Sequence, residues 1–187
     1  MRSCPQDLRS LERGAHSFVH RSTRRRLCHA RPVNDPRERV AATVIAASQG
    51  EEITAAGVQH LFKLTGDHTG GRFGLEEFAV PPGTVGARPH IHRAHDEYFY
   101  VLTGELTVAT DAGEVLLTAG DVAHAPRGSV HGFRNASERT PTTGLCMYTP
   151  AGYEQYFRDV HDAVEAGTEL TIDLLTGLRA RYDTESV

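Results

Sequence analysis

Three histidines and one glutamate in this sequence have the residue types and the spacing of metal ligands. His90 and His92 stand two positions apart in the segment HIHRAHDE. Side chains at positions i and i+2 of a β-strand share a face, so the two imidazoles are expected to converge. Glu97 ends the same segment, and His131 lies further on in GSVHGF. These four side chains are the predicted ligands of one metal ion.

The ligand set indicates which metals and reactions are compatible with it. Three neutral imidazoles and one carboxylate suit a divalent transition metal such as Fe, Mn, Ni, Co, Cu or Zn, whereas Mg or Ca would require more oxygen ligands. About two positions would stay open on an octahedral ion, enough for a substrate oxygen together with O2 or water. Such an ion could polarise a carbonyl or hold an enolate. Glu97 has a competing role, because a carboxylate beside a metal can also take a substrate proton as a general base.

Other side chains on the same strand faces are expected to line a substrate pocket. Phe99 and Val101 follow the ligand glutamate at strand spacing, and Phe133 lies two positions after the last ligand histidine. Together they would form a largely dry pocket for a flat or apolar substrate. His124 is placed in the same pocket as a hydrogen-bond donor. A packed histidine is an equally good interpretation, because strand alternation does not settle which face His124 takes.

Two further residues near the ligands are given structural interpretations. His95 lies in RAHD, which is predicted to be a turn, so a solvated loop histidine is favoured over a fifth ligand. If that turn closes a hairpin, Glu97 returns beside the histidine pair. Cys146 lies in an apolar strand between Leu145 and Met147, where a buried, unreactive thiol is expected.

The middle of the chain must supply the strands that position these side chains. From about Val58 the sequence breaks into short apolar stretches such as VQHLFKL, EYFYVL, ELTVAT and TGLCMYT, separated by turn segments such as TGDHTGG, PPGTVG and TDAGE. Short strands with turn signals at nearly regular spacing predict an all-β sandwich or barrel rather than βαβ units.

After Pro150 the hydrophobic period changes from that of a strand to that of a helix. A first helical stripe ends before Gly167, and a second, shorter one lies in TIDLLTGLRARY. Both are predicted to be helices that cover the β-domain. The stripes consist of Tyr153, Tyr156, Phe157, Val160 and Val164, and of Leu174, Leu175, Leu178 and Tyr182.

Composition sets the class of protein and the domain division. The 187 residues are 39% hydrophobic with a net charge of −4, which gives no reason to expect nucleic acid or a membrane as partner. Three unpatterned cysteines and the lack of a secretory signal predict a cytoplasmic protein. Residues 1–45 are predicted to be a basic, disordered arm, 46–150 the β-domain, and 151–187 a helical extension. For the arm, a nucleic-acid contact and an organelle transit peptide are less favoured alternatives.

Two segments together resemble the signature motifs of the cupin superfamily. The second motif, Gly-x5-Pro-x-Gly-x2-His-x3-Asn, is matched at every position over residues 120–135. The first, Gly-x5-His-x-His-x3,4-Glu-x6-Gly, is matched over residues 90–104 but lacks its leading glycine, because Gly83 lies one residue too far away and Gly86 too near. The resemblance covers roughly residues 55–150.

This resemblance implies a fold and a set of activities. The fold is a double-stranded β-helix, the cupin jelly-roll barrel, here similar to compact single-barrel bacterial members usually called quercetin dioxygenase-like. The implied function is that of a metal-dependent dioxygenase acting on a small enolisable or phenolic compound with O2. Alternatives are a non-redox cyclase, isomerase or decarboxylase, or a barrel that only binds a small ligand. Homodimerisation through an outer face of the barrel is also suggested by the family.

Overall fold

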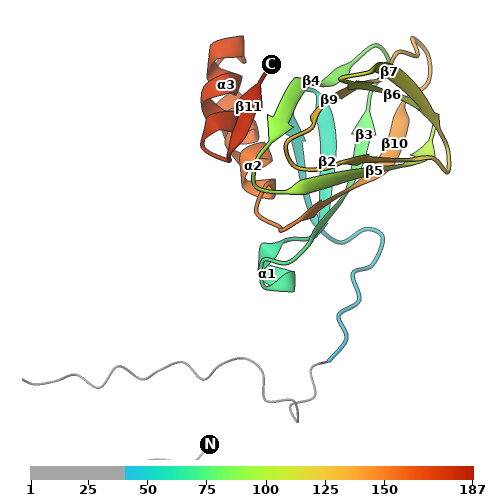
Figure 1. The fold of residues 1–187 in the computed structure, drawn as a ribbon. Helices are drawn as coiled ribbons and strands as arrows, with labels where there is room; N and C mark the ends of the chain where they lie inside the picture. Colours follow the sequence, from blue (N-terminus) through green and yellow to red (C-terminus); the bar gives the residue numbers. More distant parts are fainter. Residues whose placement is uncertain (1–40) are drawn as a thin grey trace, which may run out of the picture. The chain divides into compact units, whose positions relative to one another are not determined.

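The computed structural model describes residues 41–187, so almost all of the basic arm predicted for residues 1–45 lies outside the described part. Its dominant feature is a pair of antiparallel β-sheets with helices on one side (Figure 1). Among residues 41–187, none of the helices has the length and hydrophobicity of a membrane-spanning segment.

The first sheet has six strands in the order β1-β2-β3-β10-β5-β8. Burial alternates residue by residue along its central strands, as expected for a sheet with one face in the core and one in solvent. A single turn of helix, α1 (Gly66–Thr69), follows β2. The strands are β1 (Glu51–Ala55), β2 (Val58–Leu64), β3 (Gly74–Val80), β10 (Thr142–Thr149), β5 (Asp96–Thr103) and β8 (Val122–Ala125).

The second sheet has five strands in the order β11-β4-β9-β6-β7. In the part of the chain that the structure describes, no ladder joins it to the first sheet, so the two sheets form the jelly roll that the sequence predicted without closing into a continuous barrel. The strands are β11 (Thr184–Ser186), β4 (Val85–His92), β9 (Val130–Arg134), β6 (Glu105–Thr110) and β7 (Gly113–Thr118).

The chain changes sheets where the sequence suggested a hairpin. β4 belongs to the second sheet and β5 to the first, so the turn over residues 93–95 crosses between sheets instead of pairing the two strands. The hairpin expectation was therefore wrong. Side chains that the two strands direct inward consequently face each other across the interior of the sandwich. The chain crosses back at Gly104, whose φ of 76° is readily adopted only by glycine.

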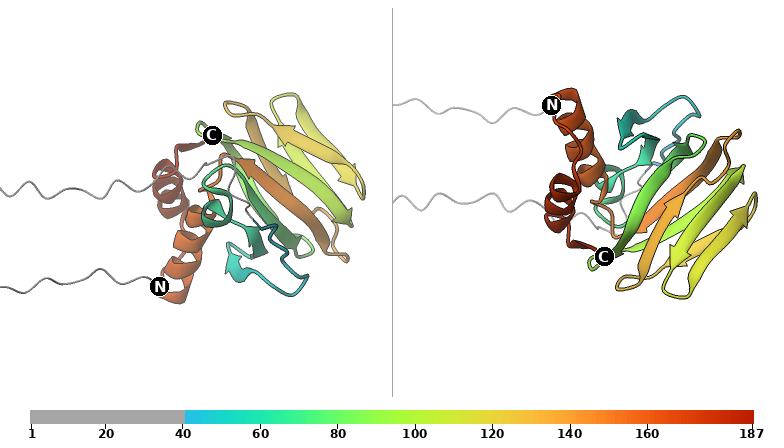
Figure 2. Two further views of the ribbon diagram at one scale, coloured as in Figure 1. Left: turned by 90° about the horizontal axis from the view of Figure 1, so that it is seen from below. Right: turned by 90° about the horizontal axis from the view of Figure 1, so that it is seen from above.

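Two helices cover one open side of the sandwich, as the sequence predicted. α2 (Glu154–Glu165) contacts β1 at the edge of the first sheet, and α3 (Ile172–Ala180) contacts β11 at the edge of the second. Both lie on the same side of the sheets in Figures 1 and 2. The predicted stripes face inward through Tyr156, Val160 and Leu178, whereas Val164 is exposed. The short strand β11, which follows α3 and pairs with β4, was not predicted.

A close approach of two backbones fixes how the central strands of the second sheet meet. A Cβ added at Gly132 in β9 would lie 2.8 Å from the carbonyl oxygen of Ala87 and 2.9 Å from the nitrogen of Pro89, both backbone atoms of β4. Backbone atoms cannot rotate away as side-chain ends can. Only glycine therefore lets β9 approach β4 at this distance.

We expect Gly132→Ala to lower the free energy of unfolding by about 1–3 kcal/mol, the usual cost of overpacking. The matched control is Gly177→Ala. Gly177 lies within α3 with no atom in the way of a Cβ, so its replacement is expected to raise the free energy of unfolding by about 0.5–1 kcal/mol. Urea denaturation of both variants measures the two effects. Equal stability of Gly132→Ala and the wild type would contradict the close approach.

Candidate metal centre

The four predicted ligands come together in the interior between the two sheets. His90 and His92 extend from β4, His131 from the neighbouring strand β9 at a position paired with His90, and Glu97 from β5 of the opposite sheet. One ligand atom from each residue can be chosen so that all four lie within 4.8 Å of one another. All four residues are buried, with 1–4% of their surface exposed.

The inner nitrogens and one carboxylate oxygen make direct contacts. His90 Nε2 lies 3.0 Å from His92 Nε2. Glu97 Oε2 lies 3.0 Å from His131 Nε2 and 3.5 Å from His92 Nε2. Glu97 Oε1 lies 3.4 Å from Cys146 Sγ, which donates to it. The carboxylate therefore faces the imidazoles with one oxygen and is held by a thiol through the other.

The outer ring nitrogens determine which nitrogens carry protons. His90 Nδ1 lies 2.8 Å from the carbonyl oxygen of Arg88, and His131 Nδ1 lies 3.3 Å from that of Ser129. A carbonyl oxygen can only accept, so both Nδ1 atoms donate. In a neutral imidazole this leaves the lone pair on Nε2, the nitrogen that points into the cluster.

A hydroxyl from the C-terminal strand orients the third imidazole in the same way. The Thr184 hydroxyl donates to the carbonyl oxygen of Tyr182 at 3.1 Å, so it accepts from His92 Nδ1 at 2.8 Å. The Nε2 lone pair of His92 is therefore also directed inward. The role of Thr184 was not predicted from the sequence, because Thr184 lies 92 positions after His92 and reaches it through the unpredicted strand β11.

Charge in the cluster is arranged around its one carboxylate. Burial alone would raise the pKa of Glu97, but the hydrogen bond from His131 and the neighbouring imidazole of His92 hold it well below its ordinary value. Burial opposes a charge on His131, yet the hydrogen bond to Glu97 raises the pKa of this histidine. Burial, together with the neighbouring imidazoles of His131 and His92, keeps the pKa of His90 well below its ordinary value. Without a metal, the cluster therefore holds its proton between His131 and Glu97.

The donor set fits a divalent transition metal. Two Nε2 lone pairs 3.0 Å apart repel each other unless a cation or a proton lies between them, and burial disfavours the proton on His90. A metal ion would be coordinated by these lone pairs and would displace the proton shared by His131 and Glu97. His90, His92, Glu97 and His131 form a buried cluster that could bind a metal ion.

His95 is buried, contrary to the expectation of a solvated loop histidine. Only 4% of its surface is exposed, and its ring packs on those of His92 and Tyr153 at centroid distances of 4.0 and 4.6 Å. Tyr153 precedes α2, so the C-terminal extension covers a turn that the sequence alone presented as a surface loop. Burial, more than the nearby imidazole of His92, lowers the pKa of His95 to about 4.

The pKa of His95 predicts acid sensitivity of the metal-free protein. The ordinary pKa is 6.5, so between pH 6.5 and 4 the unfolded chain binds a proton that the folded chain excludes, and stability falls as the pH falls. For His95 alone the loss is of the order of 3 kcal/mol. His95→Phe keeps the ring and removes the titration, so its unfolding free energy should fall less steeply over this range. Urea denaturation at pH 7, 5.5 and 4.5 measures both slopes, and identical slopes would exclude this origin.

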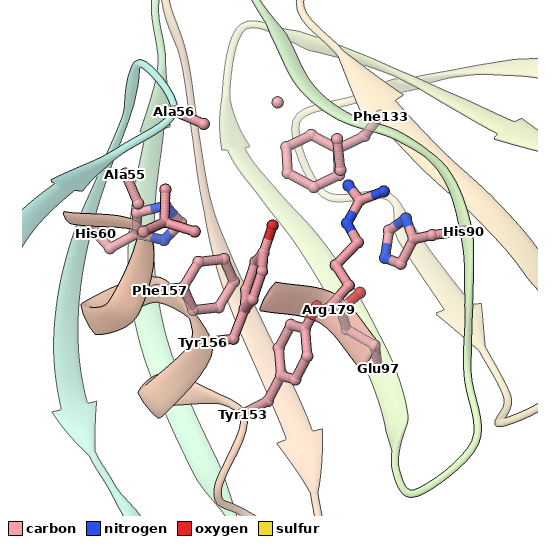
Figure 3. A pocket seen from close by; sticks show the side chains of 13 residues that line it. Ala55, Ala56, His60, His90, Glu97, Phe133, Tyr153, Tyr156, Phe157 and Arg179 are labelled. Atoms are coloured by element: carbon pink, nitrogen blue, oxygen red, sulfur yellow. The ribbon is translucent and has the colours of Figure 1, made fainter. Parts of the chain in front are cut away.

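The predicted pocket residues separate into different places. Phe133 lines a narrow inner cavity of about 40 Å³ beside His90 and Glu97. Figure 3 shows this cavity, which is closed from the other side by the α2 residues Tyr156 and Phe157. Phe99, Val101 and His124 are not among its lining residues. Phe99 and His124 line a separate open hollow beside His131, where the exposed His124 stacks on Tyr98 at 4.6 Å, and Val101 is fully buried in the core.

Two other buried polar groups lie near the cluster. Cys146 is buried, as predicted, and burial raises the pKa of its thiol well above the ordinary value, which fits an unreactive cysteine. His60 Nδ1 lies 3.1 Å from Glu76 Oε1 on neighbouring strands, and both residues are buried. His60 also lines the inner cavity. No spacing pattern in the sequence indicates this second pair, because it depends on the register of β2 with β3.

Comparisons with known sequences support the sequence resemblance. Residues 76–148 match the family described as Cupin domain. The chain is 30% identical over 122 residues to quercetin 2,3-dioxygenase of Bacillus subtilis, covering 65% of this chain and 35% of that protein. It is 30% identical over 116 residues to quercetin 2,3-dioxygenase of Aspergillus japonicus, covering 59% and 33%. The chain thus spans about a third of the length of these two relatives.

Solved structures share the fold. A sugar phosphate isomerase from a cupin superfamily, from Silicibacter pomeroyi, superposes with a TM-score of 0.51 at 26% identity, covering 57% of this chain and 75% of that one. KdgF from Halomonas sp. gives 0.54 at 18% identity, covering 62% and 99%. A predicted oxalate decarboxylase from Thermotoga maritima gives 0.52 at 23% identity, covering 58% and 99%. The last two, at below 25% identity, bear on the fold alone.

Proposed function

The chain belongs to the cupin superfamily and resembles quercetin dioxygenase-like members, and from this premise we propose that it is a metal-dependent dioxygenase acting on a small enolisable or phenolic compound. His90, His92, Glu97 and His131 are the proposed ligands of one divalent transition metal. O2 is the proposed second substrate. The names of the two curated relatives support this choice of reaction.

The convergence of imidazole lone pairs carries the proposal. The hydrogen bonds of His90 and His92 through Nδ1 direct both Nε2 atoms into one buried point, next to a single carboxylate. Unpaired acceptors in a dry interior destabilise a fold. A purely structural role for these histidines therefore does not explain why their lone pairs face each other. A bound divalent ion would supply Lewis-acid chemistry and, if redox-active, a path for electrons to O2.

The remaining groups suit the exclusion of water and the deprotonation of a substrate. Phe133, Tyr156 and Phe157 give the inner cavity aromatic walls, which exclude water beside His90 and Glu97, and its volume of about 40 Å³ admits only a small reacting group. Glu97 Oε1 points away from His131 and toward Cys146. A carboxylate whose two oxygens have different partners can hold a cation with one oxygen and accept a substrate proton with the other.

Oxygen uptake tests this proposal. Protein loaded with Fe, Mn, Co, Ni, Cu or Zn is incubated with flavonols, β-diketones and catechols in an oxygen-electrode cell. We expect at least one combination of metal and substrate to consume O2, and the same combination to be inactive with His131→Ala. Absence of O2 consumption across the panel with protein of verified metal content would argue against a dioxygenase.

A second candidate is a non-redox isomerase, cyclase or decarboxylase with the same ligands. The likeness to the Silicibacter pomeroyi structure, whose name describes a sugar phosphate isomerase, favours it. In this case the metal would act only as a Lewis acid, and Zn would suffice. Turnover that persists under anaerobic conditions distinguishes this candidate from the dioxygenase.

A further inference from the structure

Arg179 is a buried cation with no anionic partner among the described residues. It lies in α3, has 8% of its surface exposed, and its Nε is buried with no hydrogen-bond partner among residues 41–187. Its Nη1 donates to the Ser186 hydroxyl at 3.3 Å. Buried arginines are normally paired, because an unpaired charge in the interior is costly. In the described part of the chain, the arginines that pair with carboxylates are Arg93, Arg127, Arg134, Arg158 and Arg181.

Arg179 lies between two neighbouring cavities and lines both of them. One is the inner cavity beside His90 and Glu97. The other is an outer pocket of about 500 Å³ between β4 and the C-terminal helices, lined in part by Leu175 and Val164. Arg179 lines both, so a molecule filling the outer pocket and reaching inward would pass its guanidinium. Figure 3 shows the side chain extending across the inner cavity toward Phe133 and His90. The outer pocket has the size of a small-molecule site, which is roughly 300–1,000 Å³.

The surrounding positive charges would stabilise an anionic group beside Arg179. Arg179 lines the inner cavity together with His90 and Glu97, so its positive charge lies beside the proposed ligands. A divalent ion held by the four ligands, as the proposed function requires, would place further positive charge beside the same cavity. Two cations flanking a largely apolar cavity repel each other unless an anionic group lies between or beside them. Glu97 is already committed to the imidazoles.

We propose that Arg179 binds an anionic group of the substrate, a carboxylate or a comparable oxyanion, while the apolar body of the substrate occupies the outer pocket. The planar guanidinium donates from several N–H groups in a fixed fork that matches a carboxylate. This inference rests on the proposed function and narrows its substrate class, from an enolisable or phenolic compound in general to one that also carries an acidic group. Arg179 is then a specificity-determining residue rather than a structural one.

The test compares two probes of equal shape and different charge. Benzoate and the neutral benzamide are titrated by calorimetry into chelator-treated wild-type protein, so that neither probe can bind through a metal. We expect benzoate to bind at least about 10-fold more tightly than benzamide, as for a charge-assisted bidentate contact. In Arg179→Gln the preference should fall to about one. In Arg179→Lys part of it should remain, because lysine keeps the charge and loses the fork.

Controls separate this site from net charge and from the proposed metal centre. Arg181→Gln removes the same charge from a side chain that is 66% exposed and pairs with Asp159, so it should keep the preference. Equal binding of the two probes to the wild type, absence of benzoate binding, or a preference that survives in Arg179→Gln overturns the inference. Thermal unfolding is measured in parallel. A lowered Tm of Arg179→Gln with unchanged preference would make Arg179 a structural residue.

Metal content of the wild type, measured before chelation, distinguishes failure of the two proposals. If the protein binds no metal but prefers benzoate through Arg179, the proposed function is contradicted and the anion site is retained. Protein that binds metal and shows no preference overturns the anion site alone.

Discussion

His131→Ala protein is expected to bind a divalent transition metal at least about 100-fold more weakly than the wild type. Loss of a group that merely orients a ligand costs about 10–100-fold in metal affinity, and loss of the ligand itself should cost more. The variant also leaves Glu97 buried without its 3.0 Å partner, which lowers the stability of the metal-free fold. Elemental analysis of protein purified without a polyhistidine tag, followed by competition with a chromophoric chelator, measures the change.

Two control variants remove an imidazole elsewhere. His60→Ala takes away a histidine that is as buried as His131 but pairs with Glu76, and His124→Ala takes away an exposed one. Both should retain the metal content of the wild type. If His60→Ala and His131→Ala lost metal to the same extent, the loss would reflect general destabilisation of the core. If His131→Ala kept the wild-type affinity, the ion, if any, would lie elsewhere.

The sequence was sufficient to identify the four clustered residues because local rules fix most of their positions. His90 and His92 share a face through strand periodicity, and the paired register of β4 with β9 adds His131. The place of Glu97 in the cluster was predicted correctly, but the structural reason for it differs from the one inferred from the sequence. The expected hairpin would have put it beside the histidines in one sheet, whereas it reaches them from the opposite sheet across the sandwich. Spacing identified the residue, but the path of the chain was wrong.

Contacts made by the C-terminal segment could not be predicted in the same way. Thr184 orients His92, Tyr153 buries His95, and Arg179 reaches the inner cavity, yet each is far in sequence from the residue it acts on. Helical periodicity predicted two covering helices and correctly placed Tyr156 and Leu178 inward. It carries no information on which edge of a sheet a helix crosses, because that depends on packing between distant segments. The short strand β11 has no hydrophobic period of its own to reveal it.

Glu97→Gln is expected to lower the rate of the reaction found in the oxygen-uptake panel by about 10²- to 10⁴-fold, the usual contribution of a general base. The side chain keeps its size, but the amide is a weaker ligand and cannot take a proton. The matched control is Glu76→Gln, because Glu76 is equally buried and pairs with His60 rather than with the cluster.

Metal analysis of the same Glu97→Gln samples decides between the two roles of this carboxylate. Loss of both metal and activity identifies Glu97 as a ligand, since three imidazoles alone then fail to retain the ion. Retained metal with lost activity identifies it as the proton acceptor. Glu76→Gln should leave both quantities close to those of the wild type, because its carboxyl does not touch the four ligands. Wild-type rate and metal content in Glu97→Gln would remove Glu97 from the site altogether, and a metal bound by histidines alone would then need another group to accept the substrate proton.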